Sequence, residues 1–319
     1  MTRREFLRLV ALPGLALRAG PVGAQPARLD ARRAMRHVER LVAIGPHPSG
    51  SPEIKKARAY IVDELKRAGL QVREQPFTAE TPDGPIPMVN VIGEIRGRRP
   101  DVIVLGSHYD TKYFTQFRFV GANDSGSSTG LLLELGRLLA AERREWSYWC
   151  VFFDGEEARR EWSPTDGIYG SRHFASRLQA TGEARRVRAG LVMDMIGDLD
   201  LNIRREGSST PWLTEILWGT ARRLGYQRHF LAETHPVEDD HAPLLRLGIP
   251  AALLIDFDYG GRGGLNAYWH TPEDTLDKLS PESLRIVGEV VLASLPAIER
   301  ELSRAGSVAP LTRSQLACR

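Results

Sequence analysis

The sequence predicts a single α/β domain in which a mostly parallel central sheet is flanked by helices on both faces. Two observations indicate this fold class. Short segments that are apolar throughout alternate with segments whose apolar residues recur at the helical period. Strands that are apolar on both sides are typical of parallel sheets whose two faces are covered. A third observation is size, because 319 residues, 42% of them hydrophobic, suffice for a complete core.

The first residues carry the features of an export signal. Residues 2–8 (Thr-Arg-Arg-Glu-Phe-Leu-Arg) resemble a twin-arginine motif, an apolar stretch follows over 9–17, and the small residues 22–24 suit signal cleavage. We therefore expect residues 1–24 to be a signal peptide and the protein to be periplasmic or secreted. The apolar stretch is too short to span a bilayer, so we expect no transmembrane segment.

The net charge of +3 comes from this leader. Four arginines and one glutamate lie in residues 1–24, which leaves 39 basic and 39 acidic residues in the rest of the chain. A balanced charge gives no support to nucleic-acid binding. We expect residues 25–305 to form the single domain, as a monomer, and residues 306–319 to be a C-terminal tail.

Helices and strands can be assigned in order along this domain. Ser51 and Pro52 are typical of a helix N-cap and first turn, and Gly69 is a typical terminator of the same helix. Further helices are predicted over 131–139 and 212–224, and a long one begins at Ser280-Pro281. Strands are predicted over residues 89–95, 102–105, 148–153, 191–195 and 251–255.

Carboxylate and imidazole groups lie at the ends of these strands. In parallel sheets, sites form where loops leave the carboxyl ends of the strands. Residues 106–110 (Gly-Ser-His-Tyr-Asp) and 154–157 (Asp-Gly-Glu-Glu) each follow a predicted strand. Such groups, with no cysteine among them, suit zinc bound through oxygen and nitrogen. The candidate ligands are His108, Asp124, Glu157, Asp194 and His270.

Two of these positions allow a second interpretation. Asp124 lies in the segment 123–126 (Asn-Asp-Ser-Gly), which is typical of a turn or helix N-cap, so Asp124 can cap a helix over 127–142 as well as bind a metal. Glu156 and Glu157 are adjacent like charges, which repel unless a cation or proton lies between them. One of the pair can therefore bind metal while the other acts as an acid or base.

These motifs resemble two related enzyme families. Residues 106–110, 123–126 and 154–157 look like the zinc aminopeptidases that use a co-catalytic metal pair. A closer resemblance, from about residue 45 to the C-terminal helix, is to the animal-type glutaminyl cyclases of the zinc exopeptidase superfamily. The segments that carry it are 112–114, 120–122, 152–158, 162–164, 169–173, 239–241 and 269–270.

The cyclase resemblance implies an acyltransferase that binds one zinc ion. Its substrates would be peptides or proteins with an N-terminal glutamine, which is closed to pyroglutamate with release of ammonia. The implied zinc ligands are Asp124, Glu157 and His270, the implied catalytic residues are Glu156, Asp194 and Asp239, and the implied substrate-binding residues are Trp162, Val237, Glu238 and Trp269.

Other functions stay open because the sequence departs from the animal cyclases at two places. Leu253 stands where those enzymes have a histidine, and residues 256–268 are longer and rich in glycine. We expect this segment to border the pocket. A zinc aminopeptidase would use the same ligands together with His108 and Asp194, and would bind two zinc ions. A third alternative is a non-catalytic binding protein on the same scaffold, which predicts a loss of ligands that the sequence does not show.

Overall fold

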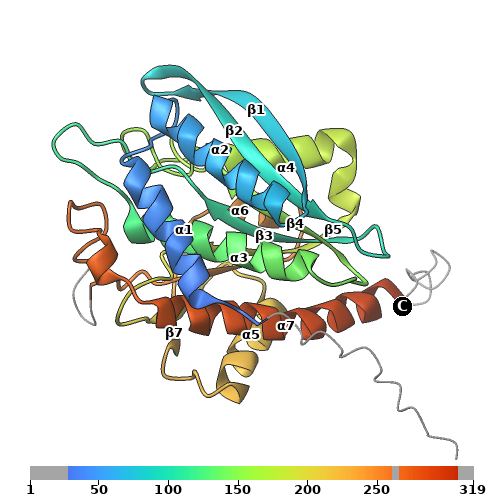
Figure 1. Ribbon diagram of the computed structural model, residues 1–319. Helices are drawn as coiled ribbons and strands as arrows, with labels where there is room; N and C mark the ends of the chain where they lie inside the picture. The colour runs from blue at the N-terminus through green and yellow to red at the C-terminus, as the bar shows by residue number, and fades with distance from the viewer. Residues whose placement is uncertain (1–27, 261–265, 308–319) are drawn as a thin grey trace, which may run out of the picture.

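The computed structural model describes residues 28–260 and 266–307 (Figure 1). The predicted signal peptide, the glycines of 261–264 and the chain from residue 308 onward lie outside this part. None of the described helices is both long and apolar enough to cross a membrane. The helices are α1 (Ala31–Ile44), α2 (Pro52–Arg67), α3 (Ser128–Ala140), α4 (Tyr169–Thr181), α5 (Pro211–Arg223), α6 (Ala242–Arg246) and α7 (Pro281–Ser307), with short helical turns η1 (Ala122–Ser127), η2 (Glu183–Arg185) and η3 (Leu276–Lys278). The strands are β1 (Gln71–Thr81), β2 (Gly84–Ile95), β3 (Val102–His108), β4 (Ser147–Phe153), β5 (Val187–Asp194), β6 (Ile203–Glu206), β7 (Phe230–His235) and β8 (Ala251–Ile255).

Six strands form the central sheet, in the order β1-β2-β4-β3-β5-β8. β4, β3, β5 and β8 are parallel to one another, whereas β2 is antiparallel to both β1 and β4. β6 and β7 pair separately. The predicted fold class is therefore confirmed. The five predicted strands correspond to β2, β3, β4, β5 and β8, and the one predicted over 191–195 runs one residue past the end of β5. The four parallel strands present their carboxyl ends at one edge of the sheet.

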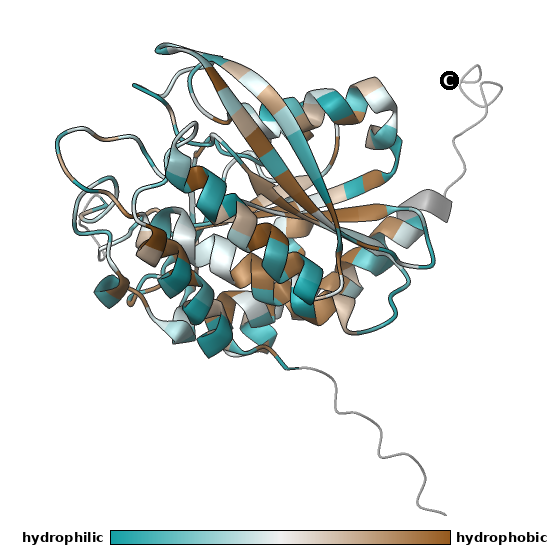
Figure 2. Ribbon diagram, turned by 45° about the horizontal axis from the view of Figure 1, so that its top comes forward, coloured by the Kyte–Doolittle hydropathy of each residue, from teal (hydrophilic) through white to brown (hydrophobic). Residues whose placement is uncertain are grey.

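The sheet separates two apolar cores. Alternate residues of β4 from Tyr148 to Phe152 pack into a core with α1, α2, α3, α5 and α7. The intervening residues from Trp149 to Phe153 pack into a second core with α4 and α6. Because both faces are covered, the strands are apolar throughout, and Figure 2 shows the hydrophobic colour running through the centre of the sheet. This explains why the sequence displays continuous apolar runs instead of alternation.

The sequence did not predict six of the described helices and strands, namely α1, α4, α6, β1, β6 and β7. β1 lies at the edge of the sheet, and only Gln75 and Ala79 of its residues are buried, so the apolar signal of a strand is weak. α4 begins after Ile168, whose backbone is left-handed (φ 42°) and whose side chain makes no capping hydrogen bond. α1 does carry a start signal, because Asp30 accepts a hydrogen bond from the backbone N–H of Arg33.

Of the two interpretations that the sequence allows for Asp124, the helix cap is not realised in the structure. α3 begins at Ser128, its N-cap position is Ser127, and no side chain caps it. Asp124 belongs instead to η1, where its carboxylate lies against two histidines. The sequence signature of a cap and that of a ligand in a tight turn are the same here, and tertiary contacts decide between them. By contrast, Ser51 caps α2 as predicted.

Gly130 allows α1 and α3 to cross closely. A Cβ atom at this position would lie 2.7 Å from the carbonyl oxygen of Ala34 and 2.7 Å from a methyl carbon of Val38, both on α1. The contact with Ala34 is to backbone, which cannot move aside as the end of a side chain can. α3 follows η1 directly, so this crossing also fixes the end of η1, the segment that carries Asp124.

We predict that Gly130→Ala destabilises the protein by about 1–3 kcal/mol, because the added methyl group forces the two helices apart. The matched control is Gly219→Ala in α5, where the nearest atom to an added Cβ is Arg223 Nη1 at 3.9 Å. That change should stabilise the protein by about 0.5–1 kcal/mol through helix propensity. Urea unfolding measures both, and equal effects of the two variants would contradict the close crossing.

Candidate active site

The carboxyl edge of the sheet brings the five candidate ligands together. His108 ends β3, Asp194 ends β5, and Glu157 follows shortly after β4. Asp124 comes from η1 and His270 from the loop between β8 and α7. Four of these side chains are buried, and that of His270 is 20% exposed.

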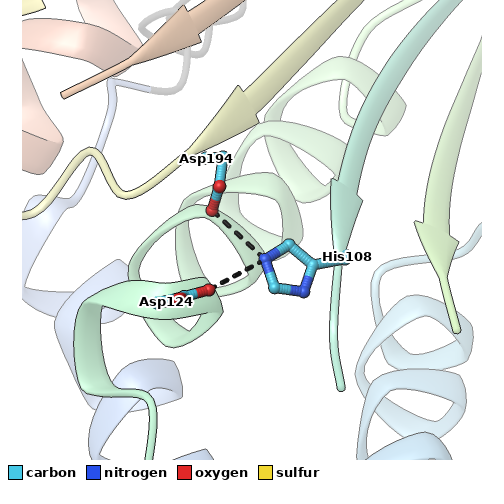
Figure 3. Close-up of side chains that lie close together, drawn as sticks. All are labelled: His108, Asp124 and Asp194. Atoms are coloured by element: carbon cyan, nitrogen blue, oxygen red, sulfur yellow. Dashed lines mark hydrogen bonds and ion pairs between the residues drawn. The ribbon is translucent and has the colours of Figure 1, made fainter. Parts of the chain in front are cut away.

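Asp124 is shared by two ligand groups. Its Oδ1 lies 3.2 Å from His108 Nε2, which is also 3.2 Å from Asp194 Oδ1 (Figure 3). Its Oδ2 lies 3.3 Å from His270 Nε2, which is 3.2 Å from the carboxylate of Glu157. In each group the three ligand atoms lie within 4.8 Å of one another. Two neighbouring cation sites with one common carboxylate would have this arrangement.

The electrostatics of the ligands fit a bound cation. Burial raises the pKa of Glu157 and that of Asp194. Burial also acts to raise the pKa of Asp124, but hydrogen bonds from the two histidines outweigh it and hold that pKa well below its usual range. The pKa of His270 is raised to about 10 because Glu157 and Asp124 outweigh the opposing effect of burial. Buried carboxylates at such short range need a positive charge beside them, and two carboxylates with an imidazole form a donor set that zinc accepts.

Glu156 is buried next to the ligand Glu157 and can take a different role. Burial raises its pKa well above its usual value, and the neighbouring Glu157 and Asp239 raise it further, against the opposing effect of His108. Burial and the nearby Asp194 likewise raise the pKa of Asp239 to about 7. Carboxyl groups with raised pKa values beside a metal site are suited to general acid–base catalysis.

Asp110 holds the two adjacent glutamates in place. Its carboxylate accepts hydrogen bonds from the backbone N–H groups of Glu156 at 3.1 Å and Glu157 at 3.4 Å. It also lies 3.4 Å from Nδ1 of His108, the nitrogen on the side away from the ligand group. No role was predicted for Asp110 from the sequence. Its one signal was its position two residues after His108 in the strand-end motif.

A cavity of about 540 Å³ opens above the ligand groups. All of the catalytic, metal and substrate-binding residues predicted from the sequence line this cavity except His108, which lies beneath it. Phe257, from the segment that departs from the animal enzymes, also contributes to the wall. The other lining residues that the sequence analysis assigned no role include Lys112, Phe114, Arg160 and Glu161.

Aromatic rings form much of the cavity wall. Trp269 stacks on His270 with ring centroids 4.0 Å apart, and Phe257 packs edge-on against Trp269 at 5.2 Å. Trp162 lies at the rim and is 43% exposed. Its loop is held from within, since Asp166 accepts hydrogen bonds from the backbone of residues 159–161. The loop is also held by Asp83 in the β1–β2 turn, which pairs with two arginines of this loop.

Glu206 holds the segment that carries Val237, Glu238 and Asp239. Its carboxylate accepts a hydrogen bond from Nε2 of His241 at 3.0 Å and others from the backbone and hydroxyl groups of residues 208 and 209. Burial acts to raise the pKa of Glu206, but these hydrogen bonds outweigh it and lower the pKa to about 2. Leu253 is buried beside this group, and its N–H donates to the hydroxyl of residue 209.

We predict that Glu206→Gln lowers stability by about 3 kcal/mol at pH 7, since a pKa depressed from 4.5 to about 2 corresponds to this free energy. The ionised carboxylate stabilises the fold above pH 4.5, and this contribution is lost as the pH falls through 2. The difference between the variant and the wild type should therefore shrink on acidification. Urea unfolding at pH 7 and pH 3 measures it.

Glu215→Gln serves as the control for this prediction. Glu215 also pairs with an arginine, Arg205, but its side chain is 69% exposed. An exposed ion pair contributes only about 0–1 kcal/mol, so this variant should stay close to the wild type. A loss in Glu206→Gln that does not change with pH would contradict the assignment of the stabilisation to the ionised carboxylate.

The fold and the ligand groups define a class of protein. An α/β sheet whose carboxyl edge carries two carboxylate–imidazole groups with a shared aspartate is the arrangement of a zinc exopeptidase-like domain. Residues 90–295 match the family described as Peptidase family M28, and the chain belongs to that family. The matched region contains all five candidate ligands.

Glutaminyl cyclases are similar to this chain over most of its length. A "Glutaminyl-peptide cyclotransferase-like protein" of Mus musculus is 31% identical over 286 residues, which cover 80% of this chain and 72% of the mouse protein. The crystal structure of an Acidobacteriales bacterium glutaminyl cyclase is 41% identical, with a TM-score of 0.83 over 89% of this chain and 99% of that chain. A Zn-dependent exopeptidase from Parabacteroides distasonis is 25% identical, with a TM-score of 0.76 over 84% and 98% of the two chains. The resemblance that the sequence motifs predicted is confirmed.

Proposed function

We propose that the protein is a zinc-dependent glutaminyl-peptide cyclotransferase, which converts the N-terminal glutamine of peptides or proteins to pyroglutamate and releases ammonia. The observation that carries the proposal is the position of Glu156. It lines one cavity together with the complete ligand group of Asp124, Glu157 and His270. The names of the relatives that match most of the chain support the same reaction.

The ligand group would hold the zinc ion. Asp124, Glu157 and His270 offer two carboxylates and one imidazole, which are donors that zinc prefers. When bound, the ion supplies Lewis-acid polarisation of the side-chain amide carbonyl of the substrate, which contributes several kcal/mol in such enzymes. Trp269 stacks on the ring of His270 and so restricts the orientation of that ligand.

Glu156 moves the protons of the reaction. The α-amine of the substrate attacks its own side-chain carbonyl carbon, a new C–N bond closes the five-membered ring, and the C–N bond to the amide nitrogen breaks. Glu156 takes the proton that the α-amine loses and delivers one to the departing ammonia, a role worth about 10²–10⁴-fold in rate. Asp239 and Asp194, both in the same cavity, would share protons with it.

The cavity wall selects the conformation that reacts. Nucleophile and carbonyl belong to one residue, so the wall needs only to hold the folded-back rotamer, and effective molarities in such reactions reach about 10⁵–10⁸ M. Trp162, Val237 and Trp269 line the wall and would serve this purpose. Their apolar surfaces also exclude water, which would otherwise compete with the α-amine for the carbonyl carbon.

A second candidate function is an aminopeptidase, and one observation favours it. His108, Asp124 and Asp194 form a second complete ligand group next to the first. With both groups in use, Glu156 would activate a water molecule for hydrolysis of the first peptide bond. The ligands alone suit either reaction, so the two functions are distinguished by the product that the enzyme forms.

We predict that the purified, zinc-loaded protein removes one ammonia, and nothing else, from a peptide that begins with glutamine. Mass spectrometry of the intact peptide measures this directly. The same peptide with an N-terminal leucine is the control and should stay unchanged. Release of the whole first residue from either peptide would overturn the cyclase proposal in favour of the aminopeptidase.

We predict that Glu156→Gln lowers kcat by about 10²–10⁴-fold, because the variant cannot accept the amine proton. Its zinc content, measured by atomic absorption, should match that of the wild type, since Glu156 belongs to neither ligand group. Glu142→Gln, at an exposed site near the end of α3, is the matched control for the loss of one carboxylate. A Glu156→Gln variant with near wild-type kcat would refute the assigned role.

The twin-arginine motif supports a further part of the proposal, namely that the enzyme acts on peptides after export. Residues 1–24 lie outside the described part of the structure, so this part rests on the sequence motif alone. The test is to fractionate cells that express the full-length chain, and cells that express a variant with both motif arginines replaced by lysine, and to measure cyclase activity in each fraction. Cyclase activity that stays in the cytoplasm in both strains would contradict export.

A further inference from the structure

The backbone of the shared ligand is held by a buried carboxylate. Asp274 Oδ1 accepts a hydrogen bond from the N–H of Asn123 at 2.8 Å, and Oδ2 accepts one from the N–H of Asp124 at 3.1 Å. Asp274 is 1% exposed and lies four residues after His270. The segment that supplies one metal ligand therefore also fixes the main chain of another.

Tyr259 completes the hydrogen bonding of this carboxylate. Its hydroxyl donates to Asp274 Oδ1 at 2.7 Å, and the whole residue is buried. Within the described part of the chain, Asp274 makes no ion pair, so the tyrosine hydroxyl and the two backbone N–H groups are its donors. No histidine or lysine nitrogen is among these donors. The loss of one of the three therefore removes a large share of the stabilisation of this buried carboxylate.

The turn that carries Tyr259 has a fixed position. Asp256 accepts hydrogen bonds from the backbone N–H groups of Asn202 at 2.8 Å and Asp258 at 3.0 Å. The N–H of Gly260 donates to Asp198 at 3.0 Å. The start of the segment that departs from the animal enzymes is thus attached to the chain that follows β5, and it presents the tyrosine hydroxyl to Asp274 from a rigid support.

We propose that Tyr259 is a positioning residue for the metal centre: its hydroxyl holds Asp274, and Asp274 holds the backbone of Asp124 so that its carboxylate faces both histidines. The inference rests on the proposed zinc site. It gives the segment 256–268, which differs from the animal enzymes, a function in metal binding in addition to the contribution of Phe257 to the cavity wall. Partners beyond the ligands commonly change metal affinity by about 10–100-fold when they are removed.

The first test compares two variants that each lose one hydroxyl group. Tyr259→Phe should raise the zinc Kd about 10-fold or more, measured by competition with a zinc-binding dye. Tyr268→Phe is the matched control. Tyr268 lies in the same segment and packs edge-on against Tyr259 at 5.4 Å, and its hydroxyl makes no hydrogen bond within the described residues. Its zinc Kd should stay within about twofold of the wild type, since the variant loses no partner of the kind that tunes metal affinity.

The second test asks whether the effect passes through Asp274. Asp274→Asn keeps the oxygen that faces Tyr259 but turns an amide NH₂ toward the N–H of Asp124, so zinc should bind more weakly than in Tyr259→Phe. If the tyrosine acts through this carboxylate, the double variant should bind zinc no more weakly than Asp274→Asn alone. Additive losses would show an independent effect of the tyrosine and would overturn the proposal.

The third test separates positioning from a general loss of structure. At saturating zinc, Tyr259→Phe should regain most of the cyclase activity that it lacks at limiting zinc. The reason is that the hydroxyl of Tyr259 is bonded to Asp274, so its loss weakens zinc binding without removing a group that takes part in the reaction. Unfolding of each metal-free variant is measured in parallel. A variant with lowered stability but an unchanged zinc Kd would overturn the proposal. If the wild type binds zinc and cyclises peptides and Tyr259→Phe has the same zinc Kd, this inference alone is overturned. If the wild type binds no zinc, the proposed function is overturned as well.

Discussion

The contact of Asp124 with two histidines is the interaction on which the rest of the site depends. One buried carboxylate lies within 3.3 Å of both imidazoles, and a further carboxylate approaches the same Nε2 atom of each histidine. So many like charges in one buried volume repel one another unless positive charge lies between them and their geometry is fixed. The parallel strands supply part of that geometry, since His108 and Asp194 end neighbouring strands.

The rest of the geometry comes from buried carboxylates that bind backbone instead of metal. Asp110 fixes the N–H groups of Glu156 and Glu157, and Asp274 fixes the N–H groups before and at Asp124. Glycine makes the first of these possible, because Gly155 adopts a positive φ of 76° just before the two glutamates. Adjacent glutamates can then take separate roles, one in a ligand group and the other beside Asp239.

The sequence points to the candidate ligands more readily than to the residues that support them, for a physical reason. His108, Glu157 and Asp194 lie at strand ends, and strands that are buried on both faces are visible as continuous apolar runs. Asp274 is recognisable only from its contact with backbone 150 residues away in the chain. A carboxylate that accepts from backbone N–H groups leaves no pattern in the sequence, since every residue except proline offers the same donor. The sequence leaves the helix-cap interpretation of Asp124 open for the same reason.

The choice between cyclisation and peptide hydrolysis depends on the cavity wall more than on the ligands. Hydrolysis needs a water molecule beside the metal, whereas in cyclisation the substrate brings its own nucleophile. Trp162, Phe257 and Trp269 supply the apolar part of this wall, which also carries charged groups such as Glu156 and Asp239. Phe257 comes from the turn that carries Tyr259, so one short segment contributes to the cavity wall and, in our proposal, to the position of Asp124.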